Sequence, residues 1–279
     1  MEKMENTIEN EPSGPSRKVI EIVEDTKPIL LKYFNKVLEV DYKKDEFDPV
    51  TAADKEADNF IRGRIKEEFP DDLILSEENN KIPNDYEGRV WMVDPLNGTK
   101  SFIKGRDTFA VVIGLVENGV PTLGCMSVPA QGKLFLAEKG KGAFEKVGDG
   151  FERIHTSSVE ELGDSILITR EPSKEVRPIE EKLDRLPFKE RIEGIAGAKV
   201  CQIARGEAEA HINTNFKASK WDIAAPQVIL EEAGGVLTDL DGNPIDYKKE
   251  TLNLERSYVA SANPALHEKI ISKLRELGV

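Results

Sequence analysis

The residues best suited to chemistry lie in one stretch, Trp91 to Lys100, in which apolar residues and an aspartate lead into a tight turn. Pro95 fixes one backbone angle of that turn and Gly98 permits an unusual one. The turn should therefore point four oxygen donors toward one small volume. They are the side chains of Asp94, Asn97 and Thr99 and the carbonyl of Leu96. Such oxygens suit a hard cation such as Mg²⁺, although the stretch on its own is more typical of a strand that ends in a helix cap.

Three further acidic stretches occupy the same kind of position, at the end of a strand or the start of a helix. They are Asp48 with Thr51 and Asp54, the pair Glu77 and Glu78, and Asp222 beside Trp221. Any one of them is ordinary, because the helix dipole favours a carboxylate at its N-terminus, and capping is the simpler role for Asp222 alone. Together the four stretches offer ligands for two or three divalent cations and an attacking water.

Charge and composition restrict the partners. The chain has 279 residues and a net charge of −13, which argues against a nucleic-acid partner and would repel a phosphate unless bound cations reversed the charge locally. No apolar segment reaches the ~20 residues that a membrane span needs. Residues 1–18 are typical of an acidic disordered tail and lack a signal-peptide pattern, which predicts a cytoplasmic protein. Cys125 and Cys201 imply no disulfide framework.

The elements that must position these residues can be predicted from periodicity and turn signals. A capping box of Thr51 and Asp54 should open one helix, and the other boundaries follow from apolar spacing. The predicted elements of the first part are helices at 19–40 and about 53–69, strands at 73–76 and 89–94, and a meander of strands over 107–146.

Strands and helices alternate in the rest of the chain, ending in a helix at 267–277. A change of composition at 146–150 suggests a boundary. We therefore expect a tail at 1–18, an α+β half at 19–147 that holds most of the site, and an α/β half at 148–279 that supplies Asp222 and substrate contacts.

Four motifs, in order, resemble the inositol monophosphatase superfamily, the Mg²⁺-dependent, lithium-sensitive phosphatases that include the fructose-1,6-bisphosphatases. They are Asp-Pro-Val-Thr-x-x-Asp at 48–54, Leu-Ser-Glu-Glu at 75–78, Trp-x-Val-Asp-Pro-Leu-x-Gly-Thr at 91–99, and Trp-Asp-x-Ala-Ala-Pro at 221–226 with Glu-Ala-Gly-Gly to 235. Within that group, the residues at 75–78, 98–103 and 220–226 are most similar to the 3′(2′),5′-bisphosphate nucleotidases. The resemblance implies a layered αβαβα sandwich with the site between an α+β half and an α/β half.

The same resemblance implies a set of metal ligands and catalytic residues. The ligands for two or three Mg²⁺ would be Glu77, Asp94, the Leu96 carbonyl, Asn97 and Asp222. Glu77, Asp48 and Thr99 would be catalytic, with Asp48 and Thr99 orienting and deprotonating the attacking water.

Substrate contacts follow from the resemblance as well. The amides of Gly98 and Thr99, at the start of a helix, would hold the scissile phosphate. Lys199, Lys217 and Lys220 are candidates for contacts to a second phosphate or a ribose, and for each of them a solvated surface role is an equal alternative.

The chain departs from the family pattern at Asn97, where the family has an aspartate. Asparagine keeps a carbonyl oxygen and loses a negative charge, so the cation that this residue shares with Asp222 should bind more weakly. Asn97 could be a natural variation with altered metal affinity, the mark of a silent enzyme, or an introduced inactivating substitution. The other catalytic positions are intact, which favours an introduced change or a slow enzyme. Deamidation of Asn97-Gly98 would restore the aspartate.

The resulting prediction is a Mg²⁺-dependent phosphomonoesterase that removes the 3′-phosphate of adenosine 3′,5′-bisphosphate or its sulfated form. A phosphatase of inositol or sugar phosphates with the same fold is the first alternative, and a silent phosphate-binding protein is the second. The expected partner is a small phosphorylated substrate, without nucleic acid or membrane, and the protein would be a monomer or a homodimer.

Overall fold

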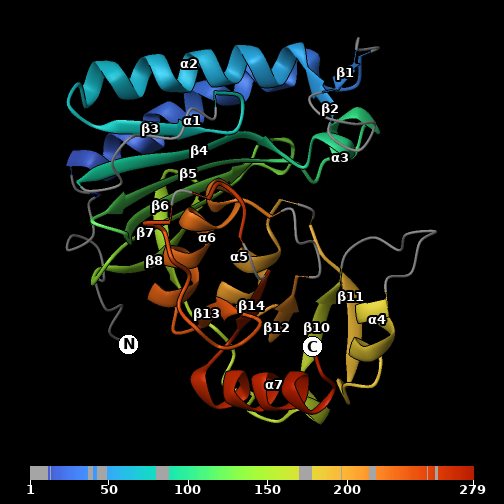
Figure 1. Ribbon diagram of the computed structural model, residues 1–279. Helices are drawn as coiled ribbons and strands as arrows, with labels where there is room; N and C mark the ends of the chain where they lie inside the picture. Colours follow the sequence, from blue (N-terminus) through green and yellow to red (C-terminus); the bar gives the residue numbers. More distant parts are fainter. Residues whose placement is uncertain are drawn as a thin grey trace, which may run out of the picture.

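A computed structural model describes residues 12, 14–36, 40–42, 49–79, 88–169, 178–195, 197–213, 218–249, 251–254 and 257–279. The molecule consists of layers (Figure 1): a helix pair, a seven-stranded sheet, a second helix pair, a five-stranded sheet and outer helices. The predicted layered αβαβα sandwich is thereby confirmed. None of the helices in these ranges is long and apolar enough to cross a membrane.

The first layer holds helices α1 (Gly14–Tyr33) and α2 (Ala52–Glu68). Residues such as Val19, Ile22 and Leu30 recur at helical spacing on the buried face of α1. The helix begins at Gly14, so the prediction of a disordered tail is wrong for residues 14–18. Residues 1–11 lie outside the described ranges.

The capping box predicted at the start of α2 is present. The Thr51 hydroxyl accepts a hydrogen bond from the Ala53 amide (3.2 Å), and the Asp54 carboxylate accepts one from the Thr51 amide (2.7 Å). Such caps satisfy amides that the first turn leaves without a helical partner. The box fixes the direction of α2 at the end where its side chains approach strand β4.

The seven-stranded sheet has the order β3-β4-β5-β6-β7-β8-β9, parallel between β3 and β4 and antiparallel elsewhere. Its strands are β3 (Leu73–Ser76), β4 (Arg89–Asn97), β5 (Ala110–Glu117), β6 (Val120–Val128), β7 (Lys133–Glu138), β8 (Gly142–Val147) and β9 (Gly150–Ile154). Strand β9 pairs with β8, so this sheet extends past the boundary that we placed at 147. A separate pair, β1 (Val40–Tyr42) and β2 (Pro49–Thr51), precedes α2, and short 3₁₀ turns occur at Pro129–Gln131 and Leu162–Asp164.

Helices α5 (Lys199–Ala204) and α6 (Lys220–Glu232) lie between the two sheets (Figure 1). Ten of the eleven residues from Lys220 to Leu230 of α6 are buried, and the remaining one, Asp222, is partly exposed. A helix that is apolar around its circumference is a buried helix. Helix α6 approaches the large sheet closely at Gly114 and Gly124, which face each other on β5 and β6. A Cβ on either glycine would lie 2.8 Å from a backbone atom of Ala225.

The five-stranded sheet has the order β11-β10-β12-β14-β13. Its strands are β10 (Ile166–Thr169), β11 (Glu190–Glu193), β12 (Ala210–Ile212), β13 (Val236–Asp239) and β14 (Tyr258–Ser261), and the outer helices are α4 (Pro178–Leu183) and α7 (Pro264–Glu276). The strands β11, β10 and β12 are parallel, while β14 runs antiparallel to both of its neighbours. This part of the chain therefore follows the predicted alternation of strands and helices.

Candidate active site

The site is built around the end of strand β4, where the pairing with β5 shifts register between Asp94 and Asn97. A bulge of this kind redirects side chains at the rim of a sheet. Asp94 is 1% exposed, and its Oδ1 accepts a hydrogen bond from the Leu96 amide (3.0 Å). The turn predicted from the sequence thus holds the Asp94 carboxylate in a fixed orientation.

Asp222 reaches the same point from the start of α6. Its Oδ2 accepts a hydrogen bond from the Ser219 amide (2.6 Å) as part of a capping box, so the capping role considered for it is real. Its Oδ1 lies 3.0 Å from Asn97 Nδ2, which donates to it. The same nitrogen donates to Asp94 Oδ2 at 2.7 Å. The Asn97 amide therefore bridges two carboxylates, at positions 94 and 222, that are 128 residues apart in the chain.

Glu77 is the third carboxylate of the cluster. It follows β3 directly, and its amide donates to the Val93 carbonyl (3.0 Å), which holds the chain beside β4. Burial, together with the nearby charges of Glu77 and Asp222, raises the pKa of Asp94 well above its usual value. Burial and the charge of Glu77 raise the pKa of Asp222 to about 7. Three carboxylates therefore lie close together, and a bound cation would relieve the repulsion between their negative charges.

Thr99 contacts a residue that the sequence did not indicate as catalytic. Its hydroxyl lies 3.2 Å from Asp54 Oδ1 and 3.1 Å from the Leu96 carbonyl, and it can donate to either acceptor. The other Asp54 oxygen accepts hydrogen bonds from the Thr51 amide (2.7 Å) and hydroxyl (2.6 Å). Asp54 ends the motif that begins at Asp48, so the motif was a signal for it. Asp48 lies outside the described residues, and its relay with Thr99 stays a prediction.

Gly98 precedes the five-residue helix α3 (Thr99–Ile103) and has φ 88°, a left-handed conformation that favours glycine. Its carbonyl accepts hydrogen bonds from the Ser101 and Phe102 amides, at 2.8 and 3.1 Å. The role of the Gly98 and Thr99 amides in binding a phosphate remains a prediction.

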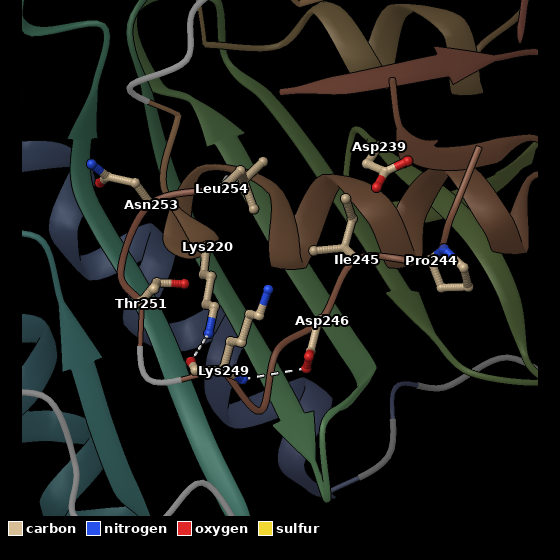
Figure 2. A pocket seen from close by; sticks show the side chains of 9 residues that line it. All are labelled: Lys220, Asp239, Pro244, Ile245, Asp246, Lys249, Thr251, Asn253 and Leu254. Atoms are coloured by element: carbon tan, nitrogen blue, oxygen red, sulfur yellow. Dashed lines mark hydrogen bonds between the residues drawn. The ribbon is translucent and has the colours of Figure 1, made fainter. Parts of the chain in front are cut away.

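The three candidate lysines have different surroundings. Lys199 opens α5, and burial lowers its pKa to about 8, against the opposing effect of Glu193. The Lys220 ammonium donates to the Tyr247 carbonyl (3.1 Å) and to the Lys249 carbonyl (Figure 2). These bonds tie the 247–249 loop to the start of α6 and favour a structural role over the substrate contact that we predicted. Lys217 lies outside the described residues.

The donor types of this cluster fit a hard divalent cation. Within the described ranges, no group of three or more Asp, Glu, His or Cys side chains is placed as a metal site. The NH₂ group of Asn97 lies between Asp94 and Asp222 and donates to both. If the amide turned its oxygen inward, that oxygen, the Leu96 carbonyl and the carboxylates of Glu77, Asp94 and Asp222 would supply the donors that Mg²⁺ prefers.

The raised pKa values predict how divalent cations and pH interact. Because metal ligands must be deprotonated, the affinity for Mn²⁺ should fall as the pH drops through 7, by up to roughly tenfold per pH unit for one displaced proton. In chelator, the folded protein holds more protons than the unfolded chain between the usual aspartate pKa of 3.8 and about 7. Its free energy of unfolding should therefore decrease as the pH rises across that range.

Calorimetric titration with Mn²⁺ at pH 5.5–8.5 and denaturant unfolding in chelator would measure both effects. An affinity for Mn²⁺ that stays constant between pH 6 and 8 would contradict the crowding of these carboxylates. The Asp222→Asn variant serves as the control, since the part of the pH dependence that belongs to Asp222 should disappear from it.

Comparison with known proteins extends over almost the whole chain. The model of the inositol monophosphatase family matches residues 17–278. The histidinol-phosphatase of Mycobacterium tuberculosis is 32% identical over 249 residues, which cover 85% of this chain and 88% of that protein. The inositol-1-monophosphatase of Bacillus subtilis is 31% identical over 246 residues, covering 85% and 87%. Among solved structures, an IMPase of Thermotoga maritima superposes with a TM-score of 0.79 at 28% identity, covering 93% of this chain and 96% of the other.

Proposed function

Because the chain belongs to the inositol monophosphatase family and is therefore a phosphatase, we propose that it is a Mg²⁺-dependent phosphomonoesterase of small phosphorylated molecules. The observation that carries this proposal is that Glu77 and Asp222 lie close enough to Asp94, and Glu77 to Asp222, for their charges to contribute to the raised pKa values of both aspartates, while the Asn97 amide links Asp94 to Asp222. Such a cluster is unfavourable without cations and suited to binding them. The cytoplasmic location, the division into halves and the oligomeric state stay predictions.

The proposed reaction is the direct attack of water on phosphorus. A bond forms between the water oxygen and phosphorus while the ester P–O bond breaks, so that an alcohol and inorganic phosphate are released. Divalent cations, when bound by Glu77, Asp94 and Asp222, supply positive charge against the phosphate and make water a better nucleophile.

The residues of the chain itself would handle the proton. Thr99 Oγ1 lies within hydrogen-bond distance of Asp54 Oδ1, so its lone pairs can orient the attacking water while the hydroxyl donates to the carboxylate. Asp54 or the predicted partner Asp48 would take up the proton through this hydroxyl, and a water molecule would supply the proton that turns the departing alkoxide into the alcohol. A Thr99→Val variant, which keeps the shape and loses the hydroxyl, separates this role from simple packing.

The names of the relatives support a phosphate monoester of the inositol or histidinol type as the first substrate. The nucleotidase-like motifs support adenosine 3′,5′-bisphosphate as the alternative, and the half-buried Lys199 is the group suited to its second phosphate. Inhibition by lithium, which the sequence resemblance implies, is a further expectation for either substrate.

The test compares kcat/KM for inositol 1-phosphate, histidinol phosphate and adenosine 3′,5′-bisphosphate with Mg²⁺. A preference of roughly tenfold or more, about 1.4 kcal/mol of transition-state binding, identifies the substrate class. Lys199→Met should impair only the bisphosphate, if that is the substrate. No phosphate release from any of the three, in this chain and in Asn97→Asp alike, would contradict the proposed function and favour a silent phosphate-binding protein.

A further inference from the structure

The side chain of Asn97 lies where the end of strand β4 meets the start of helix α6. Its Nδ2 is 2.7 Å from Asp94 Oδ2 on β4 and 3.0 Å from Asp222 Oδ1 on α6. A carboxyl oxygen that carries no proton only accepts hydrogen bonds, and the amide presents its NH₂ group, and not its oxygen, to one such oxygen of each aspartate. The two hydrogens of one nitrogen are thereby used on two acidic side chains from opposite sides of the site.

An aspartate at this position would behave in the opposite way in the absence of a cation. It would replace two hydrogen bonds to carboxylates by contacts between like charges, and only a bound cation could reverse that repulsion. An aspartate at this position would thus make the junction depend on the cation. In this chain a neutral donor takes the place of that positive charge.

We propose that Asn97 is a latch, whose amide joins β4 to α6 in the metal-free protein and competes with one divalent cation for Asp94 and Asp222. A cation between these carboxylates requires the amide to turn about its Cβ–Cγ bond, which breaks both hydrogen bonds. The protein should therefore keep its halves together without metal, and should bind one divalent cation fewer than an Asn97→Asp variant at the same free concentration. The predicted difference in the number of bound cations rests on the proposed function, because it assumes a cation site. The predicted cohesion without metal does not.

Thermal unfolding in chelator tests the latch without any substrate. Asn97→Asp should unfold roughly 5 °C or more below the unmodified chain, since two charge-assisted hydrogen bonds are lost and a like charge is added. The matched control is Asn118→Asp, the same change in an exposed hairpin turn, where the side-chain oxygen accepts a hydrogen bond from the Gly88 amide (3.1 Å). A carboxylate can also accept that bond, so the control should unfold within about 1 °C of the unmodified chain.

Saturating Mn²⁺ should change the comparison of the two proteins in favour of the variant. The stabilisation by Mn²⁺ should be larger for Asn97→Asp than for the unmodified chain, and electron paramagnetic resonance should count one more bound Mn²⁺ in the variant. Equal unfolding temperatures in chelator, or equal numbers of bound Mn²⁺, would overturn the proposal. If Asn97→Asp does not fold in chelator, Asn97→Ser, which can donate one hydrogen bond and adds no charge, should unfold at a lower temperature than the unmodified chain, and an unchanged temperature would overturn the latch.

These readouts are separate from phosphate release. If Asn97→Asp gains a Mn²⁺ and still releases no phosphate, the proposed function fails and the latch stands. If phosphate is released while neither the unfolding temperature nor the Mn²⁺ count differs, the function stands and the latch fails.

Discussion

Asp94→Asn should lose phosphate release by roughly 10²–10⁴-fold, the range that several kcal/mol of lost cation-assisted stabilisation corresponds to, and should be more stable than the unmodified chain in chelator. The two effects have one cause, which is the burial of the Asp94 carboxylate beside Glu77 and Asp222. The negative charge of Asp94 attracts a cation when one is bound, and it destabilises the folded protein when none is. Removal of that charge weakens the hydrogen bond from Asn97 but relieves the larger repulsion from Glu77 and Asp222, so the unfolding temperature in chelator should rise by about 2 °C or more.

Phosphate release and thermal unfolding, each measured with and without Mg²⁺, would detect both effects in the same preparation. Asp149→Asn, at the exposed turn between β8 and β9, is the control and should change neither quantity. A variant that loses activity together with stability in chelator would show that Asp94 is chiefly a structural residue, against our account.

Gly124→Ala is expected to destabilise the protein and to weaken cation binding together. A Cβ at this position would lie 2.8 Å from the Ala225 Cα, closer than side-chain carbons approach backbone atoms in proteins. Helix α6 would have to move away from the sheet, and it carries Asp222 at its start. Overpacking of this kind costs about 1–3 kcal/mol, which corresponds to an unfolding temperature lowered by roughly 2–12 °C.

The comparison variant for that experiment is Gly63→Ala. Gly63 lies within helix α2, and no atom lies within 4 Å of the position that its Cβ would take. This substitution should leave Mn²⁺ binding unchanged and raise stability by about 0.4–1 kcal/mol. If Gly124→Ala binds Mn²⁺ as the unmodified chain does, the close approach of α6 does not position Asp222.

Much of the architecture follows from local patterns in the sequence. The capping box of Thr51 and Asp54, the strands at Leu73–Ser76 and Lys133–Glu138, and the buried helix after Ser219 could be predicted because each depends on neighbouring residues. The convergence of Asp94 with Asp222 came from the family resemblance, since no local rule relates residues on different layers.

What the sequence missed depends on contacts between distant segments. The second role of Asp54, as acceptor for the Thr99 hydroxyl, arises only because α2 and the end of β4 are adjacent. Lys220 was one candidate for a phosphate contact, yet its ammonium donates to loop carbonyls 27 and 29 positions away. The missing negative charge at Asn97 could be recognised in the sequence. The hydrogen bonds from Asn97 to two carboxylates could be recognised only in the structure.

The most direct test of the central claim is the release of phosphate from inositol 1-phosphate as Mg²⁺ is titrated, with this chain and with Asn97→Asp side by side. We predict release that rises from background to saturation with Mg²⁺ in both proteins, with the variant faster and saturating at lower Mg²⁺. Release that is independent of Mg²⁺, or absent from both proteins at every concentration and with the other two substrates as well, would contradict the assignment of Glu77, Asp94 and Asp222 as the cation site of a phosphatase.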